Sequence, residues 1–482
     1  MATTPTVTSG TSTSPPTLSG LSSGLDTDNI VTQLMAIDRM PEKQMQINQS
    51  RSAQRQSLLQ DFSTKLKALK DAADALGDVT MWSPKQKVTS SDVSRVTAVM
   101  TSGAGVGGTT IQIDRLASST QRSYTYTTNA TADDSIIFKD GSGNAVGSPV
   151  TIPKGSDISA TVAAINASSD SPAYAAVVGP TGSQKIYLSS KTTGAPSAFT
   201  VDATSTTMSG EALVQQGLPA LYEINNGSQL SSDSNTLTDA IPGISLTLNA
   251  VTAAGSPVTI NVTPPAVDQT AVTAAVNTFI SSYNTVVDWI RTKTQEQVVP
   301  NPQTANDYLQ GVLHGDSMLT NLQYSLRNLV AGSIGDVPGL PSTLNSLMSL
   351  GISTGATTGS ATFSQDAVNG KLTLDPDKLT AALTSDPTSV KKMFTGIGGT
   401  GGFSADFDTV VNPITQANGI LDSRIQSETS TQDDLAKQIS DMEDRLKLKE
   451  DLLKSQFSAM ESAMSQSQSL QAQLLQSMPL PG

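Results

Sequence analysis

A glycine-rich loop near the start of the chain has the residue types of a phosphate-binding site. Residues 19–35 read SGLSSGLDTDNIVTQLM, in which Gly20 and Gly24 stand four apart just before an amphipathic helical pattern. Backbone N–H groups of such a loop can hold a phosphate at a helix N-terminus. Here, however, no strand precedes the loop and no lysine follows it, and the carboxylates of Asp26 and Asp28 would repel an anion. The pattern therefore argues against a nucleotide site.

The single histidine, His314, is the residue best suited to acid–base chemistry near neutral pH. Because the chain has no cysteine, a histidine–cysteine metal cluster is impossible, and a serine–histidine–acid triad would depend on His314. It stands in GVLHGDS, beside a predicted helix start, without the GxSxG turn that presents a nucleophilic serine. We therefore expect His314 to face solvent or cap a helix, and we expect no catalytic residue.

Two other motifs resemble ligand-binding loops but lack a necessary member. DGSGN, beginning at Asp140, spaces oxygen groups like a calcium loop, yet Thr151 occupies the position that requires a bidentate glutamate. A hairpin turn explains this motif better. GIGGTGG at 396–402 lacks the lysine and the flanking strand and helix of a phosphate loop, and it is typical of a flexible linker. We expect neither a metal nor a cofactor.

Composition narrows the function classes further. The 482 residues suffice for roughly three domains of about 150 residues each, but only 37% are hydrophobic and 4% aromatic, which is low for a large enzyme. With 42 acidic and 29 basic residues the formal charge is −13, so most of the surface repels nucleic acid. No apolar run reaches the length of a membrane span, so we expect no membrane insertion.

The first 17 residues, MATTPTVTSGTSTSPPT, have the composition of a disordered tail. They lack the basic start and apolar core of a secretory signal. A frayed terminus and an export signal that is read unfolded share this composition, so both interpretations stay open.

Helical periodicity follows the tail. A short helix is predicted where Ile30, Leu34 and Ile37 recur at spacings of four and three. Pro41 ends it and begins a second helix, which extends to about residue 76. Residues 46–57 of this second helix place mostly polar side chains in the register of the apolar face. Its later part carries a heptad seam formed by Leu59, Phe62, Leu66, Leu69, Ala73 and Leu76.

The C-terminal residues supply a partner helix, since no proline interrupts residues 419–478. Oppositely charged residues four apart mark its solvated face. We expect the inner stretches of both ends to form an intramolecular bundle, and the weakly apolar outer stretches to pack against other chains. The seam comprises Leu435, Ile439, Met442, Leu446, Leu453, Phe457, Met460 and Met464, followed only by Leu470, Leu474 and Met478.

Between the terminal helices the apolar pattern changes to alternation. VSRVTAVM, TTIQIDRL, ISLTLNAV and VTINVT read as strands separated by turn clusters. From Ser156 a short helix precedes two more strand patterns, AYAAVV and KIYLSS. These patterns predict an α+β fold in which both chain ends form an antiparallel helical bundle or coiled coil, with strand-rich domains inserted in the middle.

The predicted domain boundaries follow these changes of pattern. Residues 1–40 are a disordered tail and terminal leg helix, and 441–482 are the other terminal leg helix. The predicted helical domain comprises 41–85 and 269–440, one strand-rich domain comprises 86–122 and 221–268, and 123–220 form a helix-plus-strands domain inserted within it.

Several motifs, taken together, resemble one protein family along nearly the whole chain. SGLSSGLDTDNIVTQLMAIDRMP closely resembles the start of the flagellar filament cap protein, or hook-associated protein 2, family. FISSYNTVVDWI, DSMLTNLQYSLRNLV, GKLTLDPDKLTAALTSDPTSVKKMF and RLKLKEDLLKSQFSAMESAMSQ follow in the expected order. Residues of about 123–220 are similar only to a module shared by flagellins and hook proteins.

The resemblance implies a non-enzymatic assembly factor. Family members leave the cytoplasm unfolded through the flagellar type III export apparatus, form a ring-shaped homo-oligomer of about five subunits at the extracellular tip of the filament, and promote insertion of flagellin. Their terminal helices act as legs, which implies contacts with other subunits or flagellin for Leu21, Leu25, Ile30, Leu34, Ile37, Leu470, Leu474 and Met478. An export chaperone is implied to contact Leu453, Phe457, Met460 and Met464.

Other functions stay open at this stage. A flagellin-like or junction protein of the filament is the nearest alternative, and SGLSSGLDTD favours the cap family over it. An adhesin exposed at the filament tip, binding host mucin or other glycans, is a second alternative, although no residue pattern names its ligand. A carbohydrate-active enzyme is disfavoured because Asp133, Asp134 and Asp157 form no carboxylate pair that the sequence places across a substrate.

Overall fold

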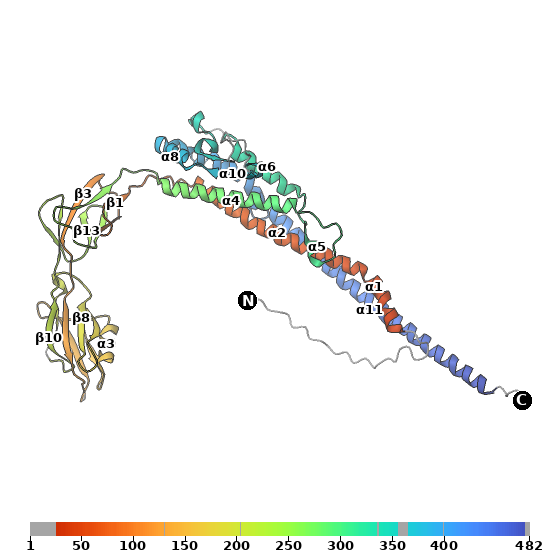
Figure 1. Cartoon of the computed structure of the whole chain (residues 1–482), viewed down its shortest axis with the longest axis horizontal. Helices are drawn as coiled ribbons and strands as arrows, with labels where there is room; N and C mark the ends of the chain where they lie inside the picture. Colours follow the sequence, from red (N-terminus) through yellow and green to blue (C-terminus); the bar gives the residue numbers. More distant parts are fainter. Residues whose placement is uncertain are drawn as a thin grey trace. The chain divides into compact units, whose positions relative to one another are not determined.

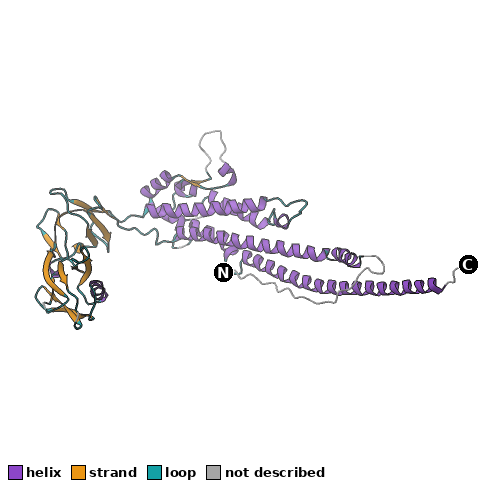
Figure 2. Ribbon diagram, turned by 60° about the horizontal axis from the view of Figure 1, so that its bottom comes forward, coloured by secondary structure: helices purple, strands orange, loops and turns teal. Residues whose placement is uncertain are grey.

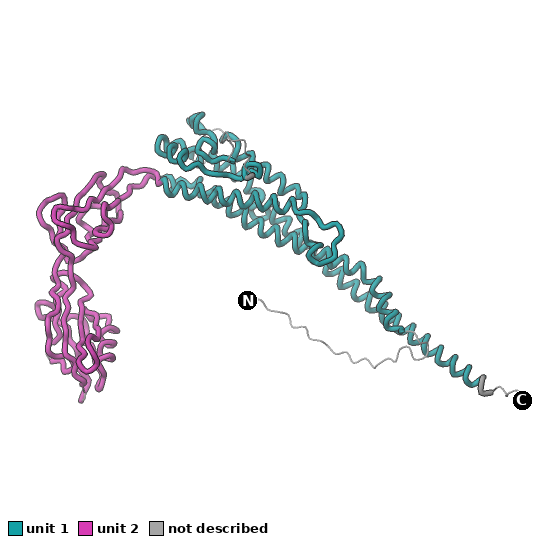
Figure 3. Tube along the Cα trace, in the orientation of Figure 1, with its two compact units in different colours: residues 1–82, 269–482 teal, residues 83–268 magenta. Residues whose placement is uncertain are grey.

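The chain folds into two compact units. The structure, a computed structural model, describes residues 26–477 apart from 130, 203, 335–336, 355–364 and 399. One unit combines the residues up to Trp82 with those from Gln269 onward, and the other comprises Ser83–Asp268 (Figure 3). Helices dominate the first unit and strands the second (Figure 2). The predicted α+β fold, with strand-rich domains inserted between helices from both chain ends, is confirmed.

Long helices lie side by side in the helical unit (Figure 1). Among them, α2 (Met40–Gly77) packs against both α4 (Gln269–Gln295) and α11 (Ile420–Ser477). The boundary predicted at residues 440 and 441 lies inside α11, which is one continuous helix. The remaining elements of the helical unit are α1 (Thr27–Asp38), α5 (Ala305–Leu309), α6 (Ser317–Ala331), α7 (Gln365–Asn369), α8 (Pro376–Ser385), α9 (Pro387–Thr395), α10 (Gly402–Thr415) and the short strands β16 (Ile352–Ser353) and β17 (Thr373–Leu374).

Aromatic side chains fill the core of the helical unit. Phe279 of α4 packs edge to face against Phe403 and Phe407 of α10, with ring centroids 5.3 and 5.8 Å apart. Phe62 of α2 stacks on Trp289 of α4 at 4.8 Å. These aromatic rings thus lie where helices distant in sequence meet. The α2 seam predicted from the sequence is also fully buried, at Leu59, Phe62, Leu66, Leu69, Ala73 and Leu76.

The prediction of a flexible linker at 396–402 is wrong for the residues of this segment that the structure describes. They form a tight turn in which Gly396 and Gly402 have positive φ angles of 67° and 78°. A Cβ atom on Gly402 would lie 2.4 Å from the backbone nitrogen of Gly396, so the two backbone segments touch and only glycine fits. The turn brings Phe394 of α9 and Phe403 of α10 within 6.1 Å of each other. Its glycines therefore serve the packing of the core.

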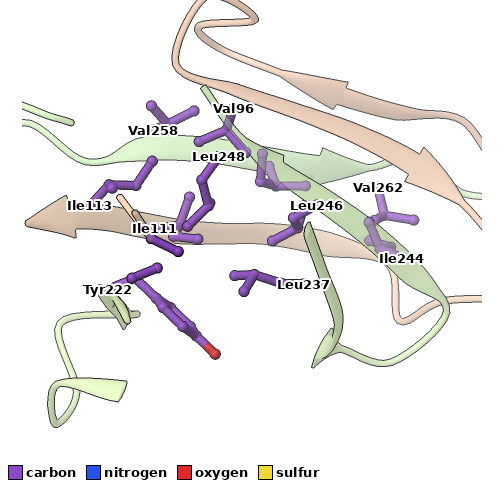
Figure 4. Close-up of a cluster of buried hydrophobic side chains, with 13 residues drawn as sticks. Val96, Ile111, Ile113, Tyr222, Leu237, Ile244, Leu246, Leu248, Val258 and Val262 are labelled. Atoms are coloured by element: carbon purple, nitrogen blue, oxygen red, sulfur yellow. The ribbon is translucent and has the colours of Figure 1, made fainter. Parts of the chain in front are cut away.

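The second unit holds two apolar cores, the first of which lies between two antiparallel sheets. Their strand orders are β1-β15-β3-β11-β12 and β13-β14-β2. Alternating side chains from facing strands meet in this core, among them Ile111, Tyr222 and Leu246 (Figure 4). Its strands are β1 (Val88–Ser90), β2 (Val96–Met100), β3 (Gly107–Arg115), β11 (Ala220–Ile224), β12 (Leu230–Ser232), β13 (Thr236–Ile241), β14 (Ile244–Leu248) and β15 (Val258–Val262).

The chain between β3 and β11 forms the second core. Two sheets, β10-β4-β8-β7 and β6-β5-β9, enclose it together with α3. The hairpin predicted at Asp140 is confirmed, because its carboxylate Oδ1 accepts the N–H groups of Ser142 and Asn144 at 2.9 and 2.8 Å. Its elements are β4 (Gln121–Tyr126), β5 (Asp134–Asp140), β6 (Ala145–Ile152), α3 (Ile158–Ala167), β7 (Ala173–Val178), β8 (Lys185–Ser190), β9 (Phe199–Val201) and β10 (Met208–Gln215).

Buried Asp134 ties β5 to the segment before β10. Its Oδ2 accepts the backbone N–H of Thr207 and the hydroxyl of Ser205, each at 2.8 Å. Burial alone would raise the pKa of Asp134, but hydrogen bonds from Thr207 and Ser205 lower it from 3.8 to about 2. Since the folded pKa is depressed, the stabilisation is complete above pH 3.8 and is lost as the pH falls through about 2.

We expect Asp134→Ala to destabilise the second core by about 1.5–3 kcal/mol, because it leaves buried donors without an acceptor. Hydrogen exchange of the amides in β4, β5 and β8 at neutral pH measures the effect. The exposed Asp133→Ala, which removes only an exposed hydrogen bond from the Lys154 N–H at 2.8 Å, is the control and should have a smaller effect. Equal exchange rates in the two variants would contradict a structural role for the Asp134 carboxylate.

Candidate functional site: the paired terminal helices

The first described helix, α1, begins and ends as its sequence predicts. The Asp26 carboxylate caps it by accepting the Asn29 N–H at 3.0 Å. The helix ends at Asp38, and α2 begins at Met40 with Pro41 in its first turn. The Asp38 carboxylate also forms a 2.7 Å ion pair with Lys449 of α11, so α1 lies along the middle of α11.

The side chains that α1 buries differ from those of the predicted stripe. Val31 and Met35 are 3% and 4% exposed and form a small core with Leu446 of α11. Leu34 and Ile37 are instead 42% and 71% exposed, and Ile30 is half-buried. The expectation that α1 lacks an internal partner is therefore corrected, because Val31 and Met35 dock it on α11. Leu34 and Ile37 of the predicted stripe remain open to solvent.

The apolar seam of α11 is covered only as far as α1 and α2 reach. Met442, Leu453 and Phe457 are half-buried beside the small core. Farther along the helix, Met460 and Met464 are each 37% exposed, and Leu470 and Leu474 are 60% and 64% exposed. The predicted contact residues Leu21, Leu25 and Met478 lie outside the described residues.

Two exposed leucines of α11 escaped the sequence prediction. Leu448 and Leu452 are 71% and 57% exposed and lie four residues apart, off the seam that contacts α1. Their i, i+4 spacing is the signal that could have identified them. They add a second apolar strip to a helix whose end is already uncovered.

A polar junction joins α2 to α11 where residues 46–57 interrupt the apolar face. The Arg55 guanidinium binds the Glu428 carboxylate through two contacts of 2.8 and 2.9 Å. The hydroxyl of fully buried Ser52 lies 2.6 Å from the same carboxylate. The next residue on each helix also pairs, because the Gln56 amide donates to the Thr429 hydroxyl at 2.6 Å. The polar residues thus pair across the interface, which makes its geometry specific.

A second bidentate pair lies one turn before Glu428 on α11. Arg424 binds Asp316, the N-cap of α6, at 3.1 and 2.6 Å. Burial raises the pKa of Glu428, but hydrogen bonds from Arg55 and Ser52 outweigh it and hold that pKa below its usual range. The base of the paired helices is therefore fixed by two bidentate pairs, whereas the outer part combines a small apolar core with the exposed ion pair between Asp38 and Lys449.

The sequence matches proteins of the bacterial flagellum. The model of the flagellar hook-associated protein 2 N-terminus matches residues 23–120, and that of the flagellar hook-associated protein 2 C-terminus matches residues 219–469. The chain belongs to the flagellar hook-associated protein 2 family. This is the family of the flagellar filament cap protein, so the resemblance stated from the sequence motifs is confirmed.

Several members of the hook-associated protein 2 family are similar to the chain. The A-type flagellar hook-associated protein 2 of Pseudomonas aeruginosa is 25% identical over 96% of this chain and 98% of its own length. Flagellar hook-associated protein 2 of Salmonella typhimurium is 25% identical over 50% of this chain and 46% of its own length. The crystal structure of the flagellar cap protein FliD D1-D2-D3 domains from Escherichia coli, 22% identical, covers 77% of this chain and 99% of that chain with a TM-score of 0.49.

The two segments matched by the hook-associated protein 2 models leave residues 121–218 between them. These residues are the strands and helix of the second core, for which the sequence showed only a general likeness to filament proteins. The paired terminal helices, by contrast, lie almost wholly within the matched segments.

The described residues of this member of the hook-associated protein 2 family offer few groups for catalysis or metal binding. His314 lies exposed in a turn, where its backbone N–H donates a hydrogen bond to the Gly311 carbonyl at 2.9 Å. Within the described ranges no group of acidic residues and histidine is arranged to hold a metal ion. The same residues contain no helix long and apolar enough to cross a membrane.

The polar junction makes a testable contribution to stability. We expect Glu428→Gln to lower the free energy of unfolding of the helical unit by about 1–3 kcal/mol at neutral pH. Because the folded pKa of Glu428 is depressed, its contribution is complete above the ordinary value of 4.5 and is lost as the pH falls through the lower folded value. Denaturant titration followed by tryptophan fluorescence reports on this unit, since both Trp82 and Trp289 lie in it.

The exposed Glu443→Gln on the same helix is the matched control and should change the free energy of unfolding by less than about 0.5 kcal/mol. A difference between Glu428→Gln and the natural chain that persists below the folded pKa would contradict a charge-based role.

Proposed function

We propose that this chain is a structural assembly factor, without enzymatic activity, that caps the distal end of the bacterial flagellar filament. In this role it promotes the insertion and polymerisation of exported flagellin. Membership of the hook-associated protein 2 family, which is the family of the flagellar filament cap protein, supports the proposal. The observation that carries it is the exposed apolar surface on the terminal helices, at Leu34, Ile37, Leu470 and Leu474.

This surface needs neighbouring chains because leucine and isoleucine side chains gain about 1.5–3 kcal/mol each when they are fully buried. Other subunits of a ring, about five in number by the family resemblance, and flagellin are the proposed partners. The chain would then function outside the cell at the filament tip, after export through the flagellar type III apparatus.

A proposed export chaperone would bind α11 before α1 docks. Leu453 and Phe457 are half-buried against α1, while Met460 and Met464 lie beyond it. A chaperone that contacts all four residues therefore competes with α1 for the same face of α11. Chaperone binding before export and docking of α1 after export would keep the chain from folding in the cytoplasm.

Deletion of the gene tests the proposed function. We expect the deletion strain to be non-motile and to release unpolymerised flagellin into the medium, because no cap retains it at the filament tip. The natural chain should restore filaments, and His314→Ala should restore them equally, since that side chain is exposed. Electron microscopy of filaments and immunoblotting of the medium measure both outcomes.

Normal filaments on the deletion strain would overturn the assignment as a cap. Loss of motility in the His314→Ala strain, with normal secretion and folding of the variant, would contradict the absence of a catalytic role.

A further inference from the structure

The outer part of α11 carries an 11-residue repeat with two apolar faces. Residues 442–452, 453–463 and 464–474 read MEDRLKLKEDL, LKSQFSAMESA and MSQSQSLQAQL. The first and fifth positions of each repeat hold residues of the seam, apart from Gln468 in the third. The seventh and eleventh positions hold six other apolar residues, which we call the outer strip: Leu448, Leu452, Ala459, Ala463, Leu470 and Leu474.

All six side chains of the outer strip are exposed. The four leucines are between 57% and 71% exposed, and both alanines are exposed as well. Eleven residues make about three turns of an α-helix, so the outer strip runs nearly parallel to the helix axis. Because Leu452 of the outer strip directly precedes Leu453 of the seam, the two faces are turned by about 100° from each other. Within the described residues, docking of α1 on the seam therefore leaves the outer strip uncovered.

The side chains of the outer strip follow the same order from either end. The three pairs that lie equally far from Glu461 are Leu448 with Leu474, Leu452 with Leu470, and Ala459 with Ala463. A second α11, related by a two-fold axis near Glu461, would therefore place leucine opposite leucine and alanine opposite alanine. The small alanines at the centre allow two helices to approach closely, and the leucines at both ends can pack alongside them.

Charge does not oppose a contact between two copies along this strip. The chain has a net charge of −13, yet Glu461 is the only charged residue of the sequence between 455 and 474. It lies on the far side of α11, because two helical positions turn the chain by about 200° from Ala459. Nearer the base, Lys449 and Lys454 form 2.7 Å ion pairs with Asp38 and Glu450. In an antiparallel pair these charges would face the uncharged residues 468–474 of the second copy.

We propose that the outer strip binds the outer strip of a second copy of this chain, with the two α11 helices antiparallel. The contact extends over residues 448–474, which correspond to about 40 Å of helix. It brings together the leucine and alanine side chains of both copies and leaves α1 docked on the seam of each. Burial of this apolar surface stabilises the pair.

This pairing goes beyond the proposed cap. All subunits of a cap point the same way relative to the filament, whereas the members of a two-fold pair point in opposite directions. Leu470 and Leu474 take part both in the pair and in the proposed contact with the filament, so the two contacts exclude each other. The pair would therefore cover the terminal helices of chains that are not seated on a filament. The exclusion rests on the proposed function, but the pairing rests on α11 alone.

Spin labels on the purified full-length chain test the pairing and its direction. The sequence contains no cysteine, so a single introduced cysteine is labelled selectively. Ser462→Cys lies near the centre of the strip and Gln473→Cys near its end, and both positions are exposed. Two labelled chains in an antiparallel pair bring their central labels together, with helix axes about 10 Å apart. Their end labels are separated by about 35 Å along the axis. We expect electron paramagnetic resonance to give a short distance for the first variant and a long one for the second.

Substitutions at the near end of the outer strip test which surface is used. We expect Leu448→Ser with Leu452→Ser to weaken self-association by about a hundredfold or more in sedimentation, because four leucine side chains leave the pair. Ser458→Ala with Ser465→Ala, exposed positions away from the outer strip, is the control and should leave self-association unchanged. Since both leucines are exposed in the monomer, the free energy of unfolding should be the same in all these variants.

Short distances at both labelled positions would indicate parallel helices and overturn the proposal. A chain that stays monomeric, or self-association that persists in the leucine variant, would overturn it as well. A leucine variant that unfolds more easily would mean that its own chain covers the outer strip, which also contradicts the pairing. The deletion strain tests the cap separately, since normal filaments there would overturn the cap and leave the pairing of the purified chain intact.

Discussion

A chain carrying Leu470→Ser and Leu474→Ser should fold and be exported normally but fail to cap filaments. Both side chains lie on the uncovered end of α11, at 60% and 64% exposure, so they contribute little to the folded monomer. If they are buried against neighbouring chains, their loss removes about 3–6 kcal/mol of association free energy per subunit. We therefore expect a non-motile strain that releases unpolymerised flagellin.

The control changes polar residues of the same helical turns. Gln471→Ser and Gln473→Ser alter the side-chain volume without removing apolar surface, and motility should survive both. Immunoblotting of the medium for the chain itself separates a failure of capping from a failure of export. Motile cells that carry both leucine substitutions would show that this end of α11 makes no essential contact.

Phe279→Ala should destabilise the helical unit more than any other single change considered for it. Phe279 is fully buried, with Tyr283, Phe403 and Phe407 around its ring. Truncation of such a side chain leaves a cavity and costs about 3–5 kcal/mol, a large part of the 5–15 kcal/mol that usually stabilises a folded domain.

Denaturant unfolding followed by tryptophan fluorescence measures this change, because Trp82 and Trp289 lie in the same unit. The neighbouring Thr278→Ala, exposed on α4, should shift the free energy of unfolding by less than about 0.5 kcal/mol. Hydrogen exchange in the strand-rich unit should be the same in both variants. A Phe279→Ala chain as stable as Thr278→Ala would mean that the aromatic cluster repacks without a cavity.

Periodicity in the sequence predicted that α1 exists but not which face it buries. Its apolar residues form two neighbouring stripes, one with Ile30, Leu34 and Ile37 and the other with Val31 and Met35. Adjacent helix positions differ by about 100° in direction, so both stripes satisfy a helical pattern. The position of Leu446 on a helix more than 400 residues later decides between them. That choice depends on tertiary contacts that no local pattern contains.

The polar junction was visible in the sequence only as a gap in the apolar seam. Arg55 and Glu428 are 373 residues apart, and each looks like an ordinary solvated residue on its own helix. The structure shows that the gap is filled by a specific pair, together with buried Ser52. Long-range polar partners of this kind cannot be predicted from one sequence, because the chain has 29 basic and 42 acidic residues and the sequence does not say which of them pair.

In the strand-rich unit, too, the sequence predicts the local element but not its partners. Alternation at Ile111 and Ile113 predicted the strand and its buried face. The partners of that strand were not predictable, since β3 pairs with β15 and β11, which follow it by more than a hundred residues. Every residue other than proline offers the same backbone hydrogen-bonding groups, so the sequence does not say which strands pair. The order of strands in the sheet depends on how the whole domain packs.

The ends of the strand-rich unit meet immediately beside the point where the helical unit stops. The N–H and carbonyl groups of Lys85 and Ala266 bond reciprocally at 2.9 and 3.1 Å, only three residues after Trp82 and three before Gln269. The chain segment that enters the strand-rich unit and the one that leaves it are thus joined by a pair of backbone hydrogen bonds. A change of sequence between Lys85 and Ala266 can replace, enlarge or remove the strand-rich domains. The two connections to the helical unit would stay at the same residues. The paired strands at Lys85 and Ala266 therefore hold both connections to the helical unit at one place, whatever the size of the segment between them.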